Sequence, residues 1–171
     1  MEKEDVAGGA GQSAAVPPDD TSGLTKLGHP LRTSFDSPKA DILEAFPNLY
    51  PGRDYVITLE HPEFTSLCPK TGQPDFGVIT VRYVPDELCV ESKSFKLYLG
   101  AFRNQGTFME SLTNKIAGDL IAVLHPRRMT VEGRFNARGG TAISVRVEYL
   151  APCISADKAA WLLSLWGKAD R

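Results

Sequence analysis

Apolar and polar residues alternate in four stretches of the chain. Residues 55–59 and 77–84 show this alternation and are rich in β-branched side chains. Residues 128–135 and 141–149 show it on either side of the turn sequence Arg138-Gly139-Gly140. A period of two, rich in Val, Ile and Tyr, is typical of half-buried strands. The pattern therefore predicts four strands, and the short connections predict that they pair in an antiparallel manner.

Apolar residues recur every three or four positions in three other stretches, which predicts helices. The first is 92–102, and the second opens on Thr107-Phe108-Met109-Glu110 and extends to Leu124, just before Pro126. Thr followed three residues later by Glu is a capping-box pattern, so we expect the second helix to begin at Thr107. Its apolar stripe is Phe108, Leu112, Ile116, Leu120 and Leu124. Residues 158–166 predict a short amphipathic helix at the C-terminus.

The predicted order ββααββ indicates an α+β fold with one antiparallel four-stranded sheet and both central helices on one face. Several strands are apolar enough for us to expect a cover on the second face as well. A small sheet with exposed edges tends to associate with copies of itself, so we also expect a symmetric oligomer. Residues 1–39 are rich in Gly, Ala, Ser and Pro and predict a disordered or weakly ordered tail, while 40–171 form a single domain.

Composition restricts the function classes. The 171 residues carry 19 Lys and Arg against 21 Asp and Glu, a net charge of -2, so we expect no stable nucleic-acid partner. No apolar run approaches the roughly 20 residues that cross a bilayer, and no signal peptide is evident. The three cysteines are widely spaced, which favours reduced thiols in the cytoplasm over disulfides. The three histidines form no ligand pattern with them, so we expect no metal site.

The candidate chemistry lies in the loop Cys68-Pro69-Lys70-Thr71-Gly72-Gln73-Pro74-Asp75, which sets a thiol near a carboxylate. A free thiol is only about 3% ionised at neutral pH, so a neighbour must favour the thiolate, and Asp75 can accept the proton. Simpler roles exist for both residues. A lone cysteine such as Cys68 is usually a small, buried apolar residue, and an aspartate such as Asp75 commonly stabilises a turn by hydrogen bonding to nearby backbone N–H groups.

Other candidate residues also have structural alternatives. Lys93 and Lys96 fit either a phosphorylated cofactor or an ordinary solvated helix surface. Glu110 fits a ligand site or the capping box of Thr107. Arg138 precedes a Gly-Gly pair that supplies positive φ angles in a hairpin.

Two longer motifs carry a family resemblance. They are Phe64-Thr65-Ser66-Leu67-Cys68-Pro69 through Asp75-Phe76, and Val90-Glu91-Ser92-Lys93-Ser94-Phe95-Lys96-Leu97-Tyr98, supported by Phe102-Arg103-Asn104 and Arg138-Gly139-Gly140. With the element order, they make residues 40–150 similar to the QueF-type nitrile reductases, in the unimodal short form. Members reduce 7-cyano-7-deazaguanine to its aminomethyl product in queuosine biosynthesis, a tRNA-modification pathway. Their fold is the tunnelling fold, in which subunits form an oligomeric barrel.

The resemblance implies a covalent mechanism with NADPH as cofactor. Cys68 would attack the nitrile carbon to give a thioimide, and Asp75 would be the proton donor. The residues implied in substrate binding are Val90, Glu91, Ser92, Met109 and Glu110. Lys93, Lys96 and Arg138 are implied around the cofactor phosphates, and the guanidinium favours NADPH over NADH.

The resemblance further implies a pentamer or a decamer with active sites at the subunit interfaces. The chain departs from the family where members commonly have histidine, at Met109 and at Gln105. Methionine cannot titrate, so the source of the later proton stays open. The alternative function is a related amidinotransferase that acts on the same nitrile carried on tRNA without NADPH.

Overall fold

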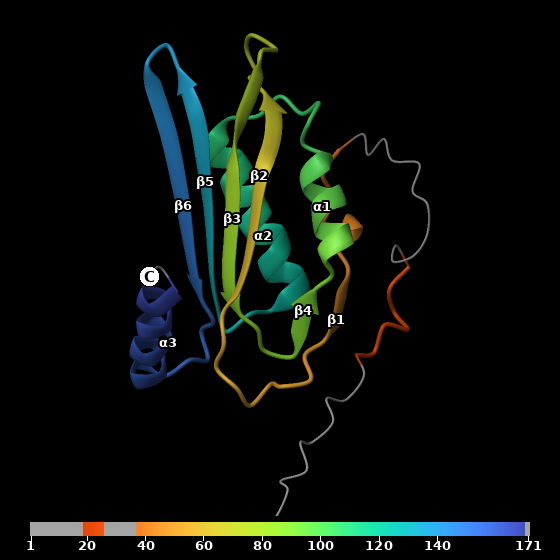
Figure 1. Cartoon of the computed structure of the whole chain (residues 1–171), viewed down its shortest axis with the longest axis vertical. Helices are drawn as coiled ribbons and strands as arrows, with labels where there is room; N and C mark the ends of the chain where they lie inside the picture. The colour runs from red at the N-terminus through yellow and green to blue at the C-terminus, as the bar shows by residue number, and fades with distance from the viewer. Residues whose placement is uncertain (1–18, 26–36, 170–171) are drawn as a thin grey trace, which may run out of the picture.

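The computed structural model describes residues 19–25 and 37–169, so most of the predicted tail lies outside the described residues (Figure 1). The elements are, in order, η1 (Ala40–Ile42), β1 (Ala45–Pro47), β2 (Ile57–Leu67), β3 (Pro74–Val84), β4 (Leu88–Val90), α1 (Ser92–Gly100), α2 (Met109–Leu124), β5 (Arg128–Arg138), β6 (Thr141–Leu150) and α3 (Ala156–Ala169). Strands β2, β3, β5 and β6 form one antiparallel sheet in the order β2-β3-β5-β6. The predicted α+β architecture is confirmed.

The first hairpin is longer than the alternation predicts. Strand β2 begins at Ile57 and continues to Leu67, and β3 begins at Pro74, before the predicted start at residue 77. The register shifts between His61 and Phe64, around Pro62, which interrupts the ladder. The shift turns Phe64 into the core, where it is 1% exposed. Because the apolar pattern changes phase at this bulge, sequence alternation ends too early.

The second hairpin closes on a two-residue turn. Gly139 and Gly140 have φ angles of 57° and 83°, and the strands that they join pair Arg138 with Thr141. Positive φ at both central positions is the requirement of a tight hairpin turn, which Gly meets without steric cost. The structural role predicted for the Gly-Gly pair is confirmed, and Arg138 is the last residue of β5.

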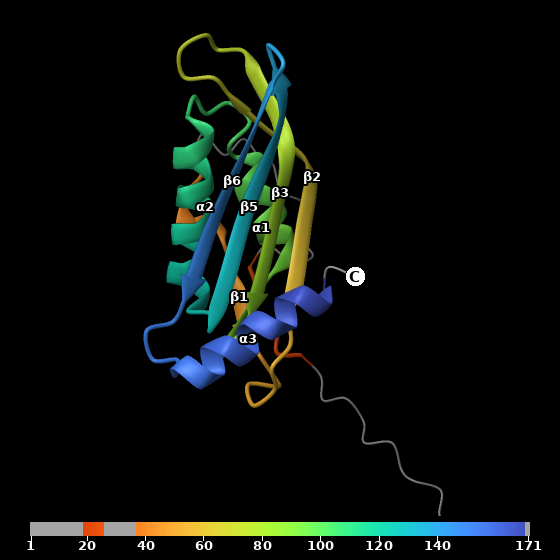
Figure 2. The same ribbon diagram turned by 90° about the vertical axis from the view of Figure 1, so that its left-hand side faces the viewer.

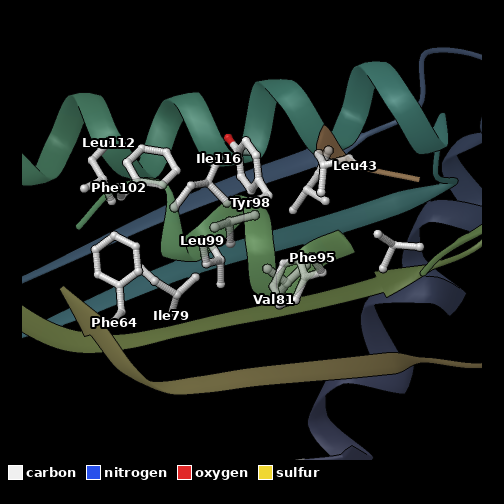
Figure 3. Packing of buried hydrophobic residues seen from close by; sticks show 14 of the residues in the cluster. Leu43, Phe64, Ile79, Val81, Phe95, Tyr98, Leu99, Phe102, Leu112 and Ile116 are labelled. Carbon is white, nitrogen blue, oxygen red and sulfur yellow. The ribbon is translucent and has the colours of Figure 1, made fainter. Parts of the chain in front are cut away.

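Helices α1 and α2 cover one face of the sheet (Figure 2). The core between them includes Phe64 and Ile79 from the strands, Tyr98 and Phe102 from the α1 region and Ile116 from α2 (Figure 3). The predicted stripe of α2 is buried from Leu112 to Leu124. Phe108 is not part of it, since it is 56% exposed.

The predicted capping box is wrong. Helix α2 begins at Met109, its N-cap is Phe108, and no side chain caps it. The backbone N–H of Thr107 instead donates to the carbonyl oxygen of Leu67 (3.1 Å), which fixes this segment to the end of β2.

The two short strands β1 and β4 pair with each other and were not predicted, because three residues are too few to show alternation.

The second face of the sheet is only partly covered. Helix α3 crosses one end of it, where Leu162 and Trp166 pack on Val84 (Figure 2). The indole N–H of Trp166 donates to Oγ1 of Thr130 (2.9 Å). The rest of this face carries polar pairs such as Thr58 beside Arg82 and Glu132 beside Arg146. The expectation of an apolar second face is therefore correct only at the end that α3 covers. No helix in the described part of the chain has the length and apolar character to span a bilayer.

Candidate active site

The thiol of Cys68 lies where β2 ends and the loop to β3 begins. The N–H of Cys68 donates to the carbonyl oxygen of Gln73 (2.8 Å), and the N–H of Gly72 donates back to that of Cys68 (2.9 Å). Gly72 has a φ of 68°, which closes the loop at low steric cost. The loop is thus a closed ring that holds the half-buried side chain of Cys68 at the end of the sheet.

The electrostatics of the loop favour the thiolate. Hydrogen bonds from the side chain and backbone of Thr71, then from the backbone of Lys70, lower the pKa of Cys68 to about 7. Arg138 adds a smaller contribution in the same direction, against the slight opposing effect of burial. Charged or dipolar donors around sulfur are the usual means by which proteins activate a cysteine. The groups that lower the pKa of Cys68 are therefore the hydrogen-bond donors of the loop and Arg138. The sequence analysis had instead suggested Asp75 as the neighbour that favours the thiolate.

Asp75 sits on β3, directly across from Ser66 in the ladder, and is only 4% exposed. Its Oδ1 accepts a hydrogen bond from Nη1 of Arg138 at 2.5 Å, and the other terminal nitrogen of Arg138 donates to Oε1 of Gln73. Asp75 first, and Cys68 second, raise the pKa of the Arg138 guanidinium. One arginine thus connects the carboxylate, the loop and the thiol.

These groups face a cavity of about 400 Å³. Its walls come from the Cys68 loop, the start of α2 and the hairpin of β5 and β6, and they include Cys68, Asp75, Met109, Glu110, Arg138 and Ile143. Five of the predicted site residues therefore meet here. A volume of this size suits a small aromatic ligand, with apolar walls from Pro69, Phe108 and Ile143 and convergent polar groups.

The sequence did not single out several residues of this site. Thr71, Gln73, Thr107 and Asn136 either line the cavity or contact its charged groups. Thr71 and Gln73 lie within the recognised loop, so their polar side chains were a usable signal. Nothing in the sequence marks Asn136, which reaches the cavity only because β5 extends beyond Phe135.

The other predicted site residues lie elsewhere in the chain. Glu91 is buried at the N-terminus of α1, where its carboxylate accepts hydrogen bonds from the backbone N–H groups of Lys93 and Ser94 (both 2.7 Å). Val90 lines a separate cavity with Tyr55 and Tyr83, of about 330 Å³. Lys96 lines a third, near β2. Residues 90–92, Lys93 and Lys96 therefore do not line the Cys68 cavity of their own chain.

Comparisons with known proteins agree on one family. A family model described as "QueF-like protein" matches residues 74–153. A relative from Desulfovibrio desulfuricans is 57% identical over 131 residues, 76% of this chain and 78% of that protein. Another, from Chlorobaculum tepidum, is 57% identical over 109 residues, 64% of this chain and 93% of that protein. Both are named NADPH-dependent 7-cyano-7-deazaguanine reductase.

A solved structure supports the fold. The crystal structure of the archaeosine synthase QueF-Like in the apo form matches with a TM-score of 0.51 and 20% identity. The match covers 54% of this chain and 91% of that one. The arrangement of strands and helices described above is therefore that of the tunnelling-fold proteins.

Proposed function

Because the chain belongs to the family of NADPH-dependent 7-cyano-7-deazaguanine reductases, we propose that it reduces the nitrile of 7-cyano-7-deazaguanine to the aminomethyl group. The observation that carries the proposal is a thiol with a pKa of about 7 that lines, together with Asp75, a cavity that suits a fused-ring base. The amidinotransferase alternative shares the thiol chemistry but needs no hydride donor, and the relatives' names specify NADPH.

The proposed chemistry begins with addition of the Cys68 sulfur to the nitrile carbon. The new S–C bond forms as one C–N π bond breaks, and Asp75 delivers to the nitrogen the proton that left the thiol. The product is a thioimide, whose C=N group accepts hydride more readily than a nitrile does. NADPH, when bound, supplies hydride, and two equivalents convert a nitrile into an amine. Once the first hydride has been added to the thioimide carbon, the C–S bond breaks, which restores the Cys68 thiolate and leaves the imine that the second hydride reduces to the amine.

The remaining cavity residues bind and orient the base. Glu110, at the start of α2, offers carboxylate oxygens to the N–H groups of a guanine-like edge, and Met109 provides an apolar surface beside it. Arg138 holds Asp75 in place through the 2.5 Å hydrogen bond. Met109 cannot carry a proton, so we assign the proton of the imine step to Asp75 acting a second time.

We also propose that the enzyme works as a ring of copies, a pentamer or two stacked pentamers, in the cytoplasm. Strands β2 and β6 are the two edges of the sheet, and each is ten or more residues long. Such edges favour pairing between copies. Since residues 90–92 do not line the cavity of their own chain, a neighbouring copy would bring Val90, Glu91 and Ser92 to the substrate. The three free cysteines support a reducing compartment.

The test is a turnover assay with purified protein, the nitrile base and NADPH. We expect consumption of about two NADPH per base, lost in Cys68→Ala because the nucleophile is missing. Mass spectrometry of the wild-type protein with the base alone should show a covalent adduct at Cys68. An adduct without any NADPH consumption would support the amidinotransferase instead, and absence of both would refute enzymatic nitrile chemistry.

A further inference from the structure

A buried hydroxyl without a hydrogen bond lies next to the reaction centre. The side chain of Ser66 is 0% exposed, and its Oγ has no hydrogen-bond partner among the residues that the structure describes. Phe64, on the same face of β2, packs its ring against those of Phe102 and Phe135, with centroids 5.8 and 6.3 Å apart. A hydroxyl in such apolar surroundings has lost its hydrogen bonds to water. Because buried polar side chains are nearly always paired, this unpaired hydroxyl needs an explanation.

The strand ladder places Asp75 directly opposite Ser66. Asp75 is 4% exposed, whereas the next residue, Phe76, is 52% exposed on the other face of the sheet. Ser66 and Asp75 therefore share the face that the helices cover. Residues directly opposite on one face of an antiparallel pair have Cβ atoms about 4.5–5.5 Å apart. Rotation about the Cα–Cβ bond of Ser66 is then enough to bring its hydroxyl to the carboxylate.

The Asp75 carboxylate has one oxygen left for such a partner. Nη1 of Arg138 donates to Oδ1 at 2.5 Å, and Arg138 is the hydrogen-bond partner of this carboxylate among the described residues. In the proposed reaction Asp75 gives a proton to the nitrile nitrogen. Since Arg138 occupies Oδ1, that proton is carried on Oδ2.

A hydroxyl suits both protonation states of Oδ2. In the acid, Oδ2 carries the proton and needs an acceptor, whereas in the carboxylate it needs a donor. A serine hydroxyl can be either. We infer that Ser66 is the second partner of Asp75, which accepts a hydrogen bond from the acid before the proton is transferred and donates one to the carboxylate afterwards. Ser66 keeps its own proton throughout, so it is a positioning residue that acts through Asp75.

The backbone around Ser66 is fixed on both edges of β2. On one edge β2 pairs with β3. On the other, the N–H of Leu67 donates to the carbonyl oxygen of Gln105 (3.0 Å), and the carbonyl oxygen of Leu67 accepts from the N–H of Thr107 (3.1 Å). Rotation of the side chain is therefore the motion that remains to Ser66, and it leads toward Asp75.

The methionine at position 109 gives this pairing its importance. Met109 cannot carry a proton, so the proposed function assigns the protons of both reduction steps to Asp75. Asp75 must then lose and regain its proton within each turnover, and a partner that suits both states is needed twice. The inference rests on the proposed function, since it concerns the acid of the same reaction.

Ser66→Ala tests the inference when turnover and urea denaturation are measured on the same protein. Because the hydroxyl is unpaired in the resting enzyme, the denaturation midpoint should stay at or above that of the wild type. We expect kcat to fall about tenfold, since Asp75 loses a hydrogen bond that its change of state uses. KM for the base should stay within about twofold, because Ser66 is not among the residues that line the cavity. An unchanged kcat, or a kcat that falls only together with the midpoint, would overturn the inference.

A matched pair of variants isolates the hydroxyl from the volume of the side chain. Ser66→Thr and Ser66→Val have nearly the same shape, and only the first keeps a hydroxyl. We expect kcat of Ser66→Thr to exceed that of Ser66→Val about tenfold, and equal values would refute the role of the hydroxyl. Thr130→Val is the control for a buried hydroxyl that has partners, Trp166 and Glu148, far from the reaction cavity. It should lower the denaturation midpoint and leave kcat unchanged.

Two further measurements show which group Ser66 acts on. The pH midpoint of Cys68 alkylation should stay near 7 in Ser66→Ala, because the donors that lower this pKa belong to the loop and to Arg138. A shifted midpoint would mean that the hydroxyl acts on the thiol, and would overturn the inference. Adding Ser66→Ala to Asp75→Asn should cause no further loss of rate, since the hydroxyl acts through this carboxylate. Additive losses would contradict it.

The rate of adduct formation separates this inference from the proposed function. Thioimide formation needs the proton of Asp75 but no NADPH, so Ser66→Ala should form the adduct about tenfold more slowly than the wild type, as mass spectrometry can follow. Slower adduct formation in a protein that never consumes NADPH would support the role of Ser66 and refute the reductase. NADPH consumption that Ser66→Ala leaves unchanged would do the reverse. A wild type with neither adduct nor turnover would refute both.

Discussion

Replacing Thr71 by valine tests the origin of the reactive thiol. The Thr71 hydroxyl is the largest contributor to a Cys68 pKa that falls from 9.0 to about 7. At pH 7 the wild-type thiol is about half ionised, whereas an unassisted one would be at most about 3% ionised. Since the backbone donors of Thr71 and Lys70 remain in Thr71→Val, we expect the pKa to recover about half the difference, to about 8.

The rate of alkylation by iodoacetamide as a function of pH measures this change. Reactivity requires the thiolate, so it is lost as the pH falls through the pKa, near 7 in the wild type and near 8 in Thr71→Val. A more basic sulfur is also intrinsically more nucleophilic, with a Brønsted slope of about 0.4–0.5. The rate at pH 7 should therefore drop only about twofold, while the plateau at high pH rises about threefold. The midpoint of the pH profile is the clearer readout.

Two variants serve as controls. Thr107→Val changes a threonine on the same cavity wall that is not among the donors to Cys68, and its midpoint should stay near 7. Cys68→Ala identifies alkylation of the other thiols, of which Cys89 is buried with a raised pKa. A wild-type midpoint near 9, or an unshifted midpoint in Thr71→Val, would refute the account of thiol activation.

The remaining predictions concern stability, measured by urea denaturation. Gly77→Ala would place a methyl group 2.5 Å from the backbone oxygen of Arg134, so we expect the free energy of unfolding to fall by at least about 2 kcal/mol. An unchanged midpoint of urea denaturation would contradict the close pairing of β3 with β5. Gly118→Ala, in α2 with nothing within 4 Å, should instead stabilise by up to about 1 kcal/mol. Trp166→Phe keeps a ring on Val84 but loses the bond to Thr130, which should cost about 1 kcal/mol; no loss would mean that this buried bond contributes nothing.

Much of the fold was predictable because strands and helices repeat with fixed periods. The four main strands, the two central helices and the C-terminal helix follow from these periods. The errors occur where one residue breaks a period or serves two purposes. Pro62 shifts the phase of β2, and Thr107 uses its backbone N–H to reach Leu67 instead of opening a helix. The strands of β1 and β4 are too short for any period.

The candidate site was predictable to a different degree. Cys68 and Asp75 lie seven positions apart, so a loop motif could place them together. The hydrogen bond of Arg138 to Asp75 joins residues 63 positions apart and depends on how two hairpins pack side by side. The burial of Ser66 opposite Asp75 depends in turn on the bulge between His61 and Phe64, which sets the face that Ser66 takes. Such contacts come from tertiary structure, which local patterns do not encode.

The pairing of a strand carboxylate with a loop thiol has a consequence for how this centre can be altered. Asp75 is fixed by the ladder to Ser66, whereas the sulfur is carried by a ring of six residues closed by two backbone hydrogen bonds. Changes of length or sequence within that ring would move the nucleophile and leave the acid where it is. A designer who wants this scaffold to accept a differently shaped cyano compound should therefore vary residues 69 and 70 and keep Thr71, Gly72 and the sheet intact.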